Sequence, residues 1–179
     1  MELIKTGLEG VVIIEPKVFG DARGYFCETW SQRVFDGLLG PVRFVQDNES
    51  KSRYGVVRGL HFQRAPHAQA KLVRVALGAV YDVAVDLRPG SPTYGHWYGV
   101  ELSAENHLQL FIPKGFAHGF SVLSEKVLFQ YKCDDFYAPE AEAAIAWDDP
   151  DLGIDWKIPA GEVILSEKDR HHPRLSELK

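Results

Sequence analysis

The chain has 179 residues, 45% of them hydrophobic, and a formal net charge of −5 at pH 7. This length suits one domain with a buried core, and we expect residues 1–179 to form a single domain. The lack of a basic excess argues against a protein that binds DNA or RNA, although a local basic pocket for a small anion stays open. Cys27 and Cys133 lack CxxC spacing, and no apolar run approaches the length of a membrane span. We therefore expect a cytoplasmic protein without membrane or nucleic-acid partners.

Short apolar runs separated by turn residues follow one another along the chain. The first run is 10–16, and residues 31–39 are predicted to form a short helix with Ser31 as its N-cap. The other predicted strands are 42–48, 56–63, 71–77, 79–87, 97–102, 108–113, 126–133 and 162–166. This spacing is typical of an antiparallel barrel or sandwich and not of alternating βα units. The pattern therefore predicts an all-β fold.

Two local motifs resemble those of the cupin barrel. Gly55 is followed by His61, and the stretch PKGFAH occupies 113–118. Cupins that hold a metal carry a second histidine two residues after the first and a glutamate on the same strand. Here that position is Gln63, and no glutamate lies between His61 and Gly78. Because a first-row metal usually needs about three or more protein ligands, we predict a cupin-type barrel without a metal.

Alternation along the strands predicts which side chains meet inside the barrel. His61 and Gln63 share one face of their strand, and Lys71 and Tyr131 lie on faces that would line the same cavity. Burial lowers the pKa of a lysine or histidine and raises that of a tyrosine. A neutral histidine can act as a base, a tyrosine as an acid, and a lysine can stabilise an oxyanion. This set suits proton abstraction from a carbon next to a carbonyl group.

Each of these side chains also has a simpler structural interpretation. His61 could be a satisfied core residue, Tyr131 a packing residue with one hydrogen bond, and Lys71 a solvated charge at a strand edge. Strict alternation places Arg58 on the face opposite His61, so either it lies outside or a bulge at the following glycine turns it inward. The segment EKDRHHP at 167–173 could be a charged surface turn.

Six blocks of sequence, in order and over nearly the whole chain, resemble the dTDP-4-dehydrorhamnose 3,5-epimerase family. The blocks are 23–30, 44–63, 71–97, 113–120, 130–142 and 165–169. The resemblance implies a cupin-type jelly-roll barrel or sandwich with a few short helices, a homodimer, and no metal or other cofactor. It implies inversion of carbons 3 and 5 of dTDP-4-dehydro-6-deoxy-D-glucose through an enolate, which gives dTDP-4-dehydro-L-rhamnose.

The resemblance also implies roles for individual residues. His61 corresponds to the base, Asp169 to its carboxylate partner, Tyr131 to the acid, and Lys71 to the group that stabilises the enolate oxygen. Phe26 could contact the nucleotide base, including that of a partner subunit, or could be an aromatic core residue. The positions that the family uses to hold the nucleotide sugar are Arg23, Phe26, Glu28, Gln46, Asn48, Arg58, His118, Glu142 and Lys168.

Other functions stay open at this point. A single-centre epimerase acting at carbon 3 or 5 of a related dTDP-4-keto-6-deoxysugar would carry the same histidine, lysine and tyrosine, and a 3,4-ketoisomerase has a similar barrel. The missing ligands argue against a metal-dependent cupin oxygenase. A non-catalytic sugar-nucleotide-binding cupin would need neither a base nor an acid. The apolar N-terminal strand could pair across a subunit interface or complete its own sheet.

Overall fold

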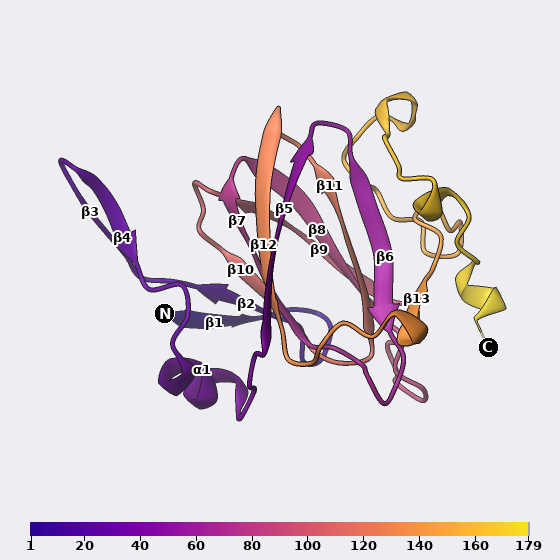
Figure 1. Cartoon of the computed structure of the whole chain (residues 1–179), viewed down its shortest axis with the longest axis horizontal. Helices are drawn as coiled ribbons and strands as arrows, with labels where there is room; N and C mark the ends of the chain where they lie inside the picture. The colour runs from indigo at the N-terminus through magenta and orange to yellow at the C-terminus, as the bar shows by residue number, and fades with distance from the viewer. Residues whose placement is uncertain (179) are drawn as a thin grey trace.

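The computed structural model describes residues 1–178 and contains two antiparallel β-sheets and a separate hairpin (Figure 1). In spatial order, the six-stranded sheet contains β1 (Glu2–Lys5), β2 (Val12–Glu15), β10 (Gln109–Ile112), β7 (Lys71–Leu77), β12 (Lys126–Cys133) and β5 (Gln46–Arg53). The five-stranded sheet contains β13 (Glu142–Ala144), β6 (Val57–Gln63), β11 (Phe116–Val122), β8 (Ala79–Asp86) and β9 (Trp97–Ser103). The hairpin consists of β3 (Val18–Asp21) and β4 (Gly24–Cys27). This architecture confirms the predicted all-β fold.

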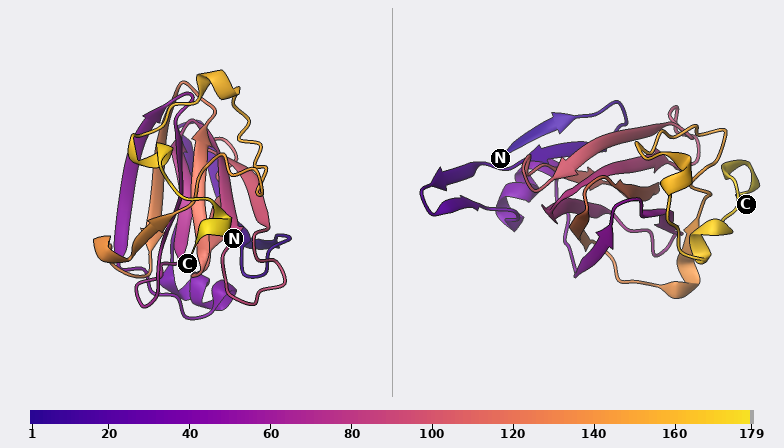
Figure 2. Two further views of the ribbon diagram at one scale, coloured as in Figure 1. Left: turned by 90° about the vertical axis from the view of Figure 1, so that its right-hand side faces the viewer. Right: turned by 90° about the horizontal axis from the view of Figure 1, so that it is seen from above.

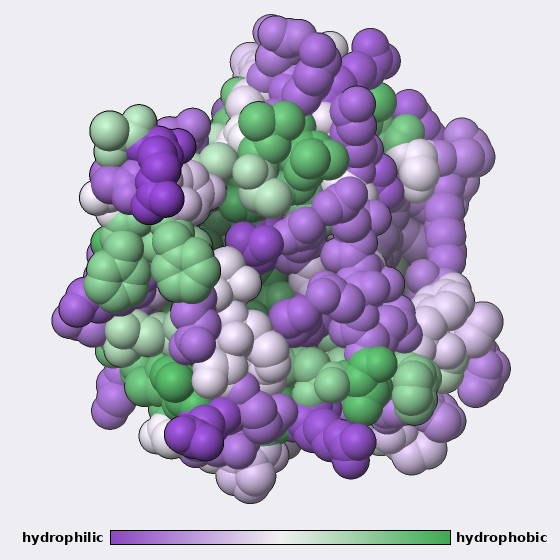
Figure 3. Space-filling model, turned by 60° about the vertical axis from the view of Figure 1, so that its left-hand side comes forward, coloured by the Kyte–Doolittle hydropathy of each residue, from purple (hydrophilic) through white to green (hydrophobic). Residues whose placement is uncertain are grey.

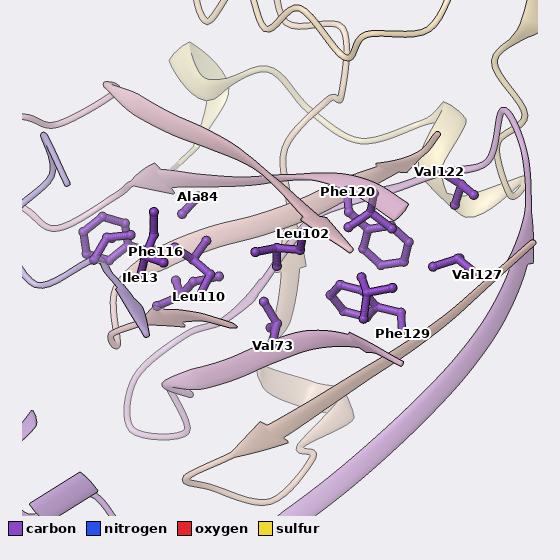
Figure 4. Close-up of a cluster of buried hydrophobic side chains, with 14 of the residues drawn as sticks. Ile13, Val73, Ala84, Leu102, Leu110, Phe116, Phe120, Val122, Val127 and Phe129 are labelled. Atoms are coloured by element: carbon purple, nitrogen blue, oxygen red, sulfur yellow. The ribbon is translucent and has the colours of Figure 1, made fainter. Parts of the chain in front are cut away.

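The main core lies between the two sheets, because each strand turns every second side chain inward. Val73 and Phe129 contribute to it from the six-stranded sheet, and Ala84 and Phe120 from the five-stranded sheet (Figure 4). The rings of Phe120 and Phe129 stack across the interface with their centroids 4.2 Å apart. Tyr131 packs against the edge of this cluster. The inward faces predicted for the strands of Val73 and Phe129 are therefore confirmed.

Both sheets are also covered on their outer faces. Helix α1 (Gln32–Leu39) buries Phe35 in a cluster with Ile14 and Leu72 on the six-stranded sheet. The C-terminal segment places Trp156 against the five-stranded sheet. It contains the short 3-10 turns η2 (Ala160–Glu162), η3 (Lys168–Arg170) and η4 (Leu175–Glu177), and η1 (Pro139–Ala141) precedes β13. In Figures 1 and 2 the hairpin lies at one end of the molecule and the C-terminal segment at the other. Among residues 1–178, no helix is both long and apolar enough to cross a membrane.

The structure corrects several of the predicted element boundaries. The helix follows Ser31 as predicted, but the Ser31 side chain makes no capping hydrogen bond. The strand predicted at 42–48 begins only at Gln46 and continues to Arg53, and all eight of its residues are polar, so an apolar pattern could not show its extent. The segment 162–166 contributes one isolated bridge and no strand.

Several strands were not predicted from the sequence. All seven residues of β11 are buried, so its sequence FAHGFSV shows no alternation of apolar and polar residues. The strands β1, β3, β4 and β13 have only three or four residues each. The apolar N-terminal run forms β2, which pairs with β1 and β10 of its own chain. It therefore completes its own sheet.

Candidate active site

A bulge in β6 determines which side chains face the cavity between the sheets. His61 pairs with His118 of β11 and Arg58 pairs with Phe120, so two residues of β6 lie opposite Gly119 alone. One extra residue reverses the alternation, and Arg58 and His61 therefore face the same side. Both line one pocket of about 270 Å³. The inward alternative for Arg58 is confirmed, and its guanidinium donates hydrogen bonds to the Ser52 hydroxyl at 3.1 and 3.2 Å.

Gly59 makes this bulge sterically feasible. Its φ of +127° lies in the region that favours glycine, and the Gly119 backbone lies directly against it. A Cβ atom at position 59 would lie 2.5 Å from the Gly119 Cα and 2.9 Å from the His118 carbonyl oxygen. The pair of facing glycines therefore brings β6 and β11 together at the point where the register changes.

His61 forms a hydrogen-bonded pair with Asp169 of η3. The His61 Nε2 lies 2.5 Å from the Asp169 Oδ1, and the carboxylate is 5% exposed while the imidazole is 34% exposed. An ionised carboxylate only accepts hydrogen bonds, so the His61 Nε2 carries the proton and the Nδ1 is left as the basic nitrogen. The predicted contact between these two residues is present, and the segment 167–173 is more than a surface turn.

The Asp169 carboxylate is held by several donors. The Ser166 hydroxyl donates to Oδ2 at 2.8 Å, and the His172 Nε2 lies 3.1 Å from Oδ1. Burial by itself would raise the pKa of Asp169, but the hydrogen bonds from His61, Ser166 and His172 outweigh it and the pKa is lowered. Asp169 therefore stays ionised while it orients the imidazole of His61.

Lys71 and Tyr131 come together on neighbouring strands of the six-stranded sheet. The Lys71 Nζ lies 5.9 Å from the centre of the Tyr131 ring. Burial lowers the pKa of Lys71, while Cys133, Asp82 and Glu142 act in the opposite direction. Burial also raises the pKa of Tyr131, with a further contribution from Cys133. The tyrosine is thus kept protonated, as a proton donor must be, and the charged form of the lysine lacks the hydration of a surface charge.

His118 forms a second buried pair, with Asp82 of the neighbouring strand β8. Its Nε2 lies 3.0 and 3.1 Å from the two carboxylate oxygens, and its ring stacks on Phe129 at 6.0 Å. Burial lowers the pKa of His118, Asp82 opposes this effect, and the nearby charges of Lys71 and His61 lower the pKa further. His118 is therefore a neutral hydrogen-bonding group near neutral pH.

Glu142 and Lys168 form an ion pair beside His61. The Lys168 Nζ lies 2.5 Å from the Glu142 Oε2, which also accepts a hydrogen bond from the Tyr137 hydroxyl at 3.1 Å. The hydrogen bond from Lys168 is the main reason that the pKa of Glu142 is lowered. Both side chains line the same pocket as His61. This exposed pair can be opened by a competing anion at little cost.

Gln46 and Asn48 lie together on the inner face of β5. The Gln46 side chain donates to the Asn48 Oδ1 at 3.0 Å and accepts from the Tyr137 backbone N–H at 3.0 Å. The Asn48 amide nitrogen lies 3.8 Å from the Cys133 sulfur. These amides therefore form a polar stretch along β5 between Cys133 and Tyr137.

Three of the predicted binding residues, Arg23, Phe26 and Glu28, lie away from His61 and its neighbours within the chain. Arg23 and Phe26 lie in the projecting hairpin, and Glu28 follows it as an exposed residue. Arg23 pairs with Asp21 of the same hairpin at 2.6 Å, and the Phe26 ring is 69% exposed. The interpretation of Phe26 as a core aromatic is therefore wrong. A space-filling view with this side brought forward shows hydrophobic side chains in groups among hydrophilic ones (Figure 3).

One group of three side chains in the described part of the chain has the composition of a metal site. The ligand atoms of His61, Asp169 and His172 all lie within 4.8 Å of one another. The same atoms are joined by the hydrogen bonds given above, with Asp169 Oδ1 shared by the two imidazoles. This is the arrangement of a hydrogen-bonded relay, so we assign no metal here, and the absence of a cofactor stays a prediction.

Sequence reasoning missed three residues of this site. Asp82 was the one charge in the middle of an apolar strand, and that exception to the pattern was a usable signal. His172 and Ser166 flank Asp169 in the sequence, but their contacts with it depend on the 3-10 turn η3. No periodic pattern predicts such a turn.

The fold and the site define a β-sandwich protein with a hydrogen-bonded histidine–carboxylate pair, a tyrosine and a lysine, residue types that suit proton transfer. Residues 5–177 match the family model described as dTDP-4-dehydrorhamnose 3,5-epimerase. The Escherichia coli enzyme of that name is 55% identical over 179 residues, covering 99% of this chain and 96% of the relative.

Solved structures of such enzymes superpose closely on this chain. The epimerase from Elizabethkingia anophelis is 57% identical with a TM-score of 0.95, covering 99% of this chain and 97% of the other. The epimerase from Legionella pneumophila, solved in complex with dTDP-4-keto-L-rhamnose, is 51% identical with a TM-score of 0.96, covering 99% and 94%. The chain belongs to the dTDP-4-dehydrorhamnose 3,5-epimerase family, and its predicted cupin-type jelly-roll fold is confirmed.

Proposed function

We propose that the protein inverts carbons 3 and 5 of dTDP-4-dehydro-6-deoxy-D-glucose and so forms dTDP-4-dehydro-L-rhamnose. The observation that carries this proposal is the contact of 2.5 Å between His61 and Asp169. It is supported by Lys71 and Tyr131 on the facing sheet, where the Lys71 Nζ lies 5.9 Å from the centre of the Tyr131 ring. The names of relatives that are about 55% identical over nearly the full chain support the choice of substrate.

The reaction begins with proton abstraction by His61. The 4-keto group acidifies the protons on both neighbouring carbons, and the free Nδ1 of His61 takes one of them. Asp169 then stabilises the imidazolium that forms, because it already accepts the Nε2 proton. The electron pair left on carbon delocalises onto the ketone oxygen as an enolate. Lys71 stabilises this oxygen, and such a group typically contributes about two to three orders of magnitude in rate.

The reaction ends with proton delivery from the opposite face by Tyr131. The raised pKa of Tyr131 keeps its hydroxyl protonated until the enolate is present. A base on one face and an acid on the other invert the centre, whereas one group alone would return the proton to the same side. The tyrosinate is reprotonated from solvent, and His61 loses its proton to solvent before the second carbon reacts.

The nucleotide part of the substrate supplies binding energy away from the reacting carbons. We assign the diphosphate to Arg58 and Lys168, because guanidinium and ammonium groups suit phosphate oxygens. Lys168 then leaves its ion pair with Glu142, and this costs little free energy because the pair is exposed. Gln46 and Asn48 are assigned to the polar groups of the nucleotide sugar, and His118 to those of the hexose.

A homodimer would explain the residues that the hairpin places away from the cavity. Phe19, Tyr25 and Phe26 are 54%, 60% and 69% exposed, and an aromatic surface of this kind is typical of an interface. We propose that Arg23 and Phe26 act at the cavity of the partner subunit. Sedimentation of the intact protein at micromolar concentration would give a monomer mass if this assignment is wrong.

The chain is proposed to act as a single domain in the cytoplasm. Cys27 and Cys133 are both free thiols, as expected in a reducing compartment.

The test is proton NMR of the 4-keto sugar nucleotide with the protein in deuterated water, coupled to a reductase that forms dTDP-rhamnose. Deuterium at carbons 3 and 5 together with product is the expected result. Exchange at one carbon alone would replace the proposal with a single-centre epimerase. No exchange at either carbon by folded protein would exclude the proton-abstraction mechanism and favour a binding protein.

A further inference from the structure

Asp169 is shared by two histidines, and the proposed reaction uses only one of them. The His172 Nε2 lies 3.1 Å from the same carboxylate oxygen that His61 contacts at 2.5 Å. The His172 side chain is only 11% exposed, and its ring lies edge-on to that of His61 with the centroids 5.7 Å apart. A polar side chain buried to this extent is held by its partner and is not a solvated surface group.

We propose that His172 is a positioning residue that fixes the Asp169 carboxylate for its work on His61. This inference rests on the proposed epimerase activity. With His172 on Oδ1 and Ser166 on Oδ2, both carboxylate oxygens have a donor besides His61. The carboxylate therefore cannot rotate about its Cβ–Cγ bond without losing hydrogen bonds. His61 then meets an acceptor that is already oriented when its ring becomes charged.

The other charged and titratable groups around this relay have partners of their own. Glu142 of β13 pairs with Lys168, and His118 of β11 pairs with Asp82. Arg58 of β6 donates to Ser52. Among residues 1–178, three side chains contact the Asp169 carboxylate: those of His61, Ser166 and His172.

The experiment compares His172→Leu with His172→Gln, and it uses His171→Leu as the matched control. Glutamine keeps an N–H donor near the place of Nε2, whereas leucine removes the donor at similar size. His171 is the neighbouring residue, but it is 71% exposed and contacts Glu167 at 2.8 Å. Steady-state kinetics give kcat and KM, and NMR of the substrate-free, ¹⁵N-histidine-labelled protein follows the Nε2 proton of His61. That signal is assigned by its loss in His61→Gln.

For His172→Leu we expect kcat to fall about 10-fold with KM within about twofold, which corresponds to a barrier roughly 1.4 kcal/mol higher. The Nε2 proton of His61 should exchange faster with water. His172→Gln should recover most of both properties, and His171→Leu should change neither. If His172→Leu does not fold, His172→Asn takes its place, because the shorter amide does not reach Asp169.

The proposal is overturned if folded His172→Leu keeps the wild-type kcat and the wild-type exchange rate, or if glutamine restores nothing. It is also overturned if only KM changes, since His172 would then act on binding. If the wild type itself proves inactive, the proposed function fails, and the NMR comparison alone decides whether His172 holds the relay.

Discussion

Lys71 lies at a position where burial disfavours its charged form, so its effects on activity and on stability can be separated. We predict that Lys71→Met lowers kcat by about 100- to 1,000-fold, the usual effect of removing one group that stabilises an oxyanion. KM should change little, because the charge on the ketone oxygen develops only as the enolate forms. The same substitution should make the protein more stable near neutral pH.

The stability effect follows from the direction of the pKa shift. Burial lowers the pKa of Lys71, and the opposing influence of Cys133, Asp82 and Glu142 does not restore it. A lysine whose pKa is lower in the folded state binds protons more readily when unfolded, so stability rises with pH through that range. Below that range the folded protein carries the full cost of the buried charge. Methionine removes this cost, and a gain of roughly 1 kcal/mol would raise Tm by about 2–4 °C in a chain of this size.

The assay measures substrate turnover and the thermal midpoint of the variant beside a matched control. Lys132→Met is that control, because Lys132 lies one residue beyond Tyr131 and points outward to Asp47 at 2.6 Å. Its kcat should be unchanged and its Tm unchanged or slightly lower. A Lys71→Met protein that keeps more than about a tenth of the wild-type kcat would refute the oxyanion role. A fall in its Tm of several degrees would show that the Lys71 charge is well paired in the folded state.

Three further predictions concern the acid, the carboxylate and the bulge. Tyr131→Phe should lower product formation at least about 100-fold while deuterium exchange at the substrate persists, because abstraction precedes the step that needs the acid; NMR that shows both lost would contradict this. The pKa of Asp169 is lowered, so the stability that its donors provide is present above its ordinary pKa of 3.8 and is lost as the pH falls below it. The free energy of unfolding, measured with urea between pH 3 and 7, should therefore be higher for the wild type than for Asp169→Asn, and this difference should shrink toward acid pH. A difference that stays constant would refute the assignment. Gly59→Ala should lower the free energy of unfolding by roughly 2–4 kcal/mol, because its Cβ would lie 2.5 Å from the Gly119 Cα at a φ of +127°. Gly37→Ala is the control: its Cβ meets open space in helix α1, and it should leave stability unchanged or raise it by up to about 1 kcal/mol.

Alternation of side chains was enough to predict much of the cavity from the sequence. It placed Lys71 with Val73, and Tyr131 with Phe129, on faces that the structure turns inward. These assignments succeed because β7 and β12 pair antiparallel with Tyr131 opposite Val73. A regular ladder preserves the period of two, so the face of one residue determines the face of its neighbours.

The same rule fails where the ladder is irregular. Arg58 and His61 are three residues apart, and only the bulge at Gly59 brings both into one pocket. The sequence shows a glycine at that position but not whether the chain bulges there. Asp82 was missed for a different reason: His118 was among the predicted residues, but its contact with Asp82 depends on the pairing of β11 with β8, and β11 was not predicted as a strand.

The pairing of β6 explains why the carboxylate partner of His61 comes from the C-terminal segment. The residues directly across from His61 on the two neighbouring strands are His118 and Ala144, so neither strand offers a carboxylate at that level. The carboxylate must come from outside the sheets, and a loop carrying it must be held at both ends to keep its position. The Ile164 N–H donates to the Gly55 carbonyl at 2.8 Å, and the Ile164 carbonyl accepts from the N–H of Val57, the first residue of β6, at 3.0 Å. The Pro173 carbonyl accepts a hydrogen bond of 2.8 Å from Ala146. The Asp169 turn is fastened between these two points, and this explains how a segment without strands holds its carboxylate against His61.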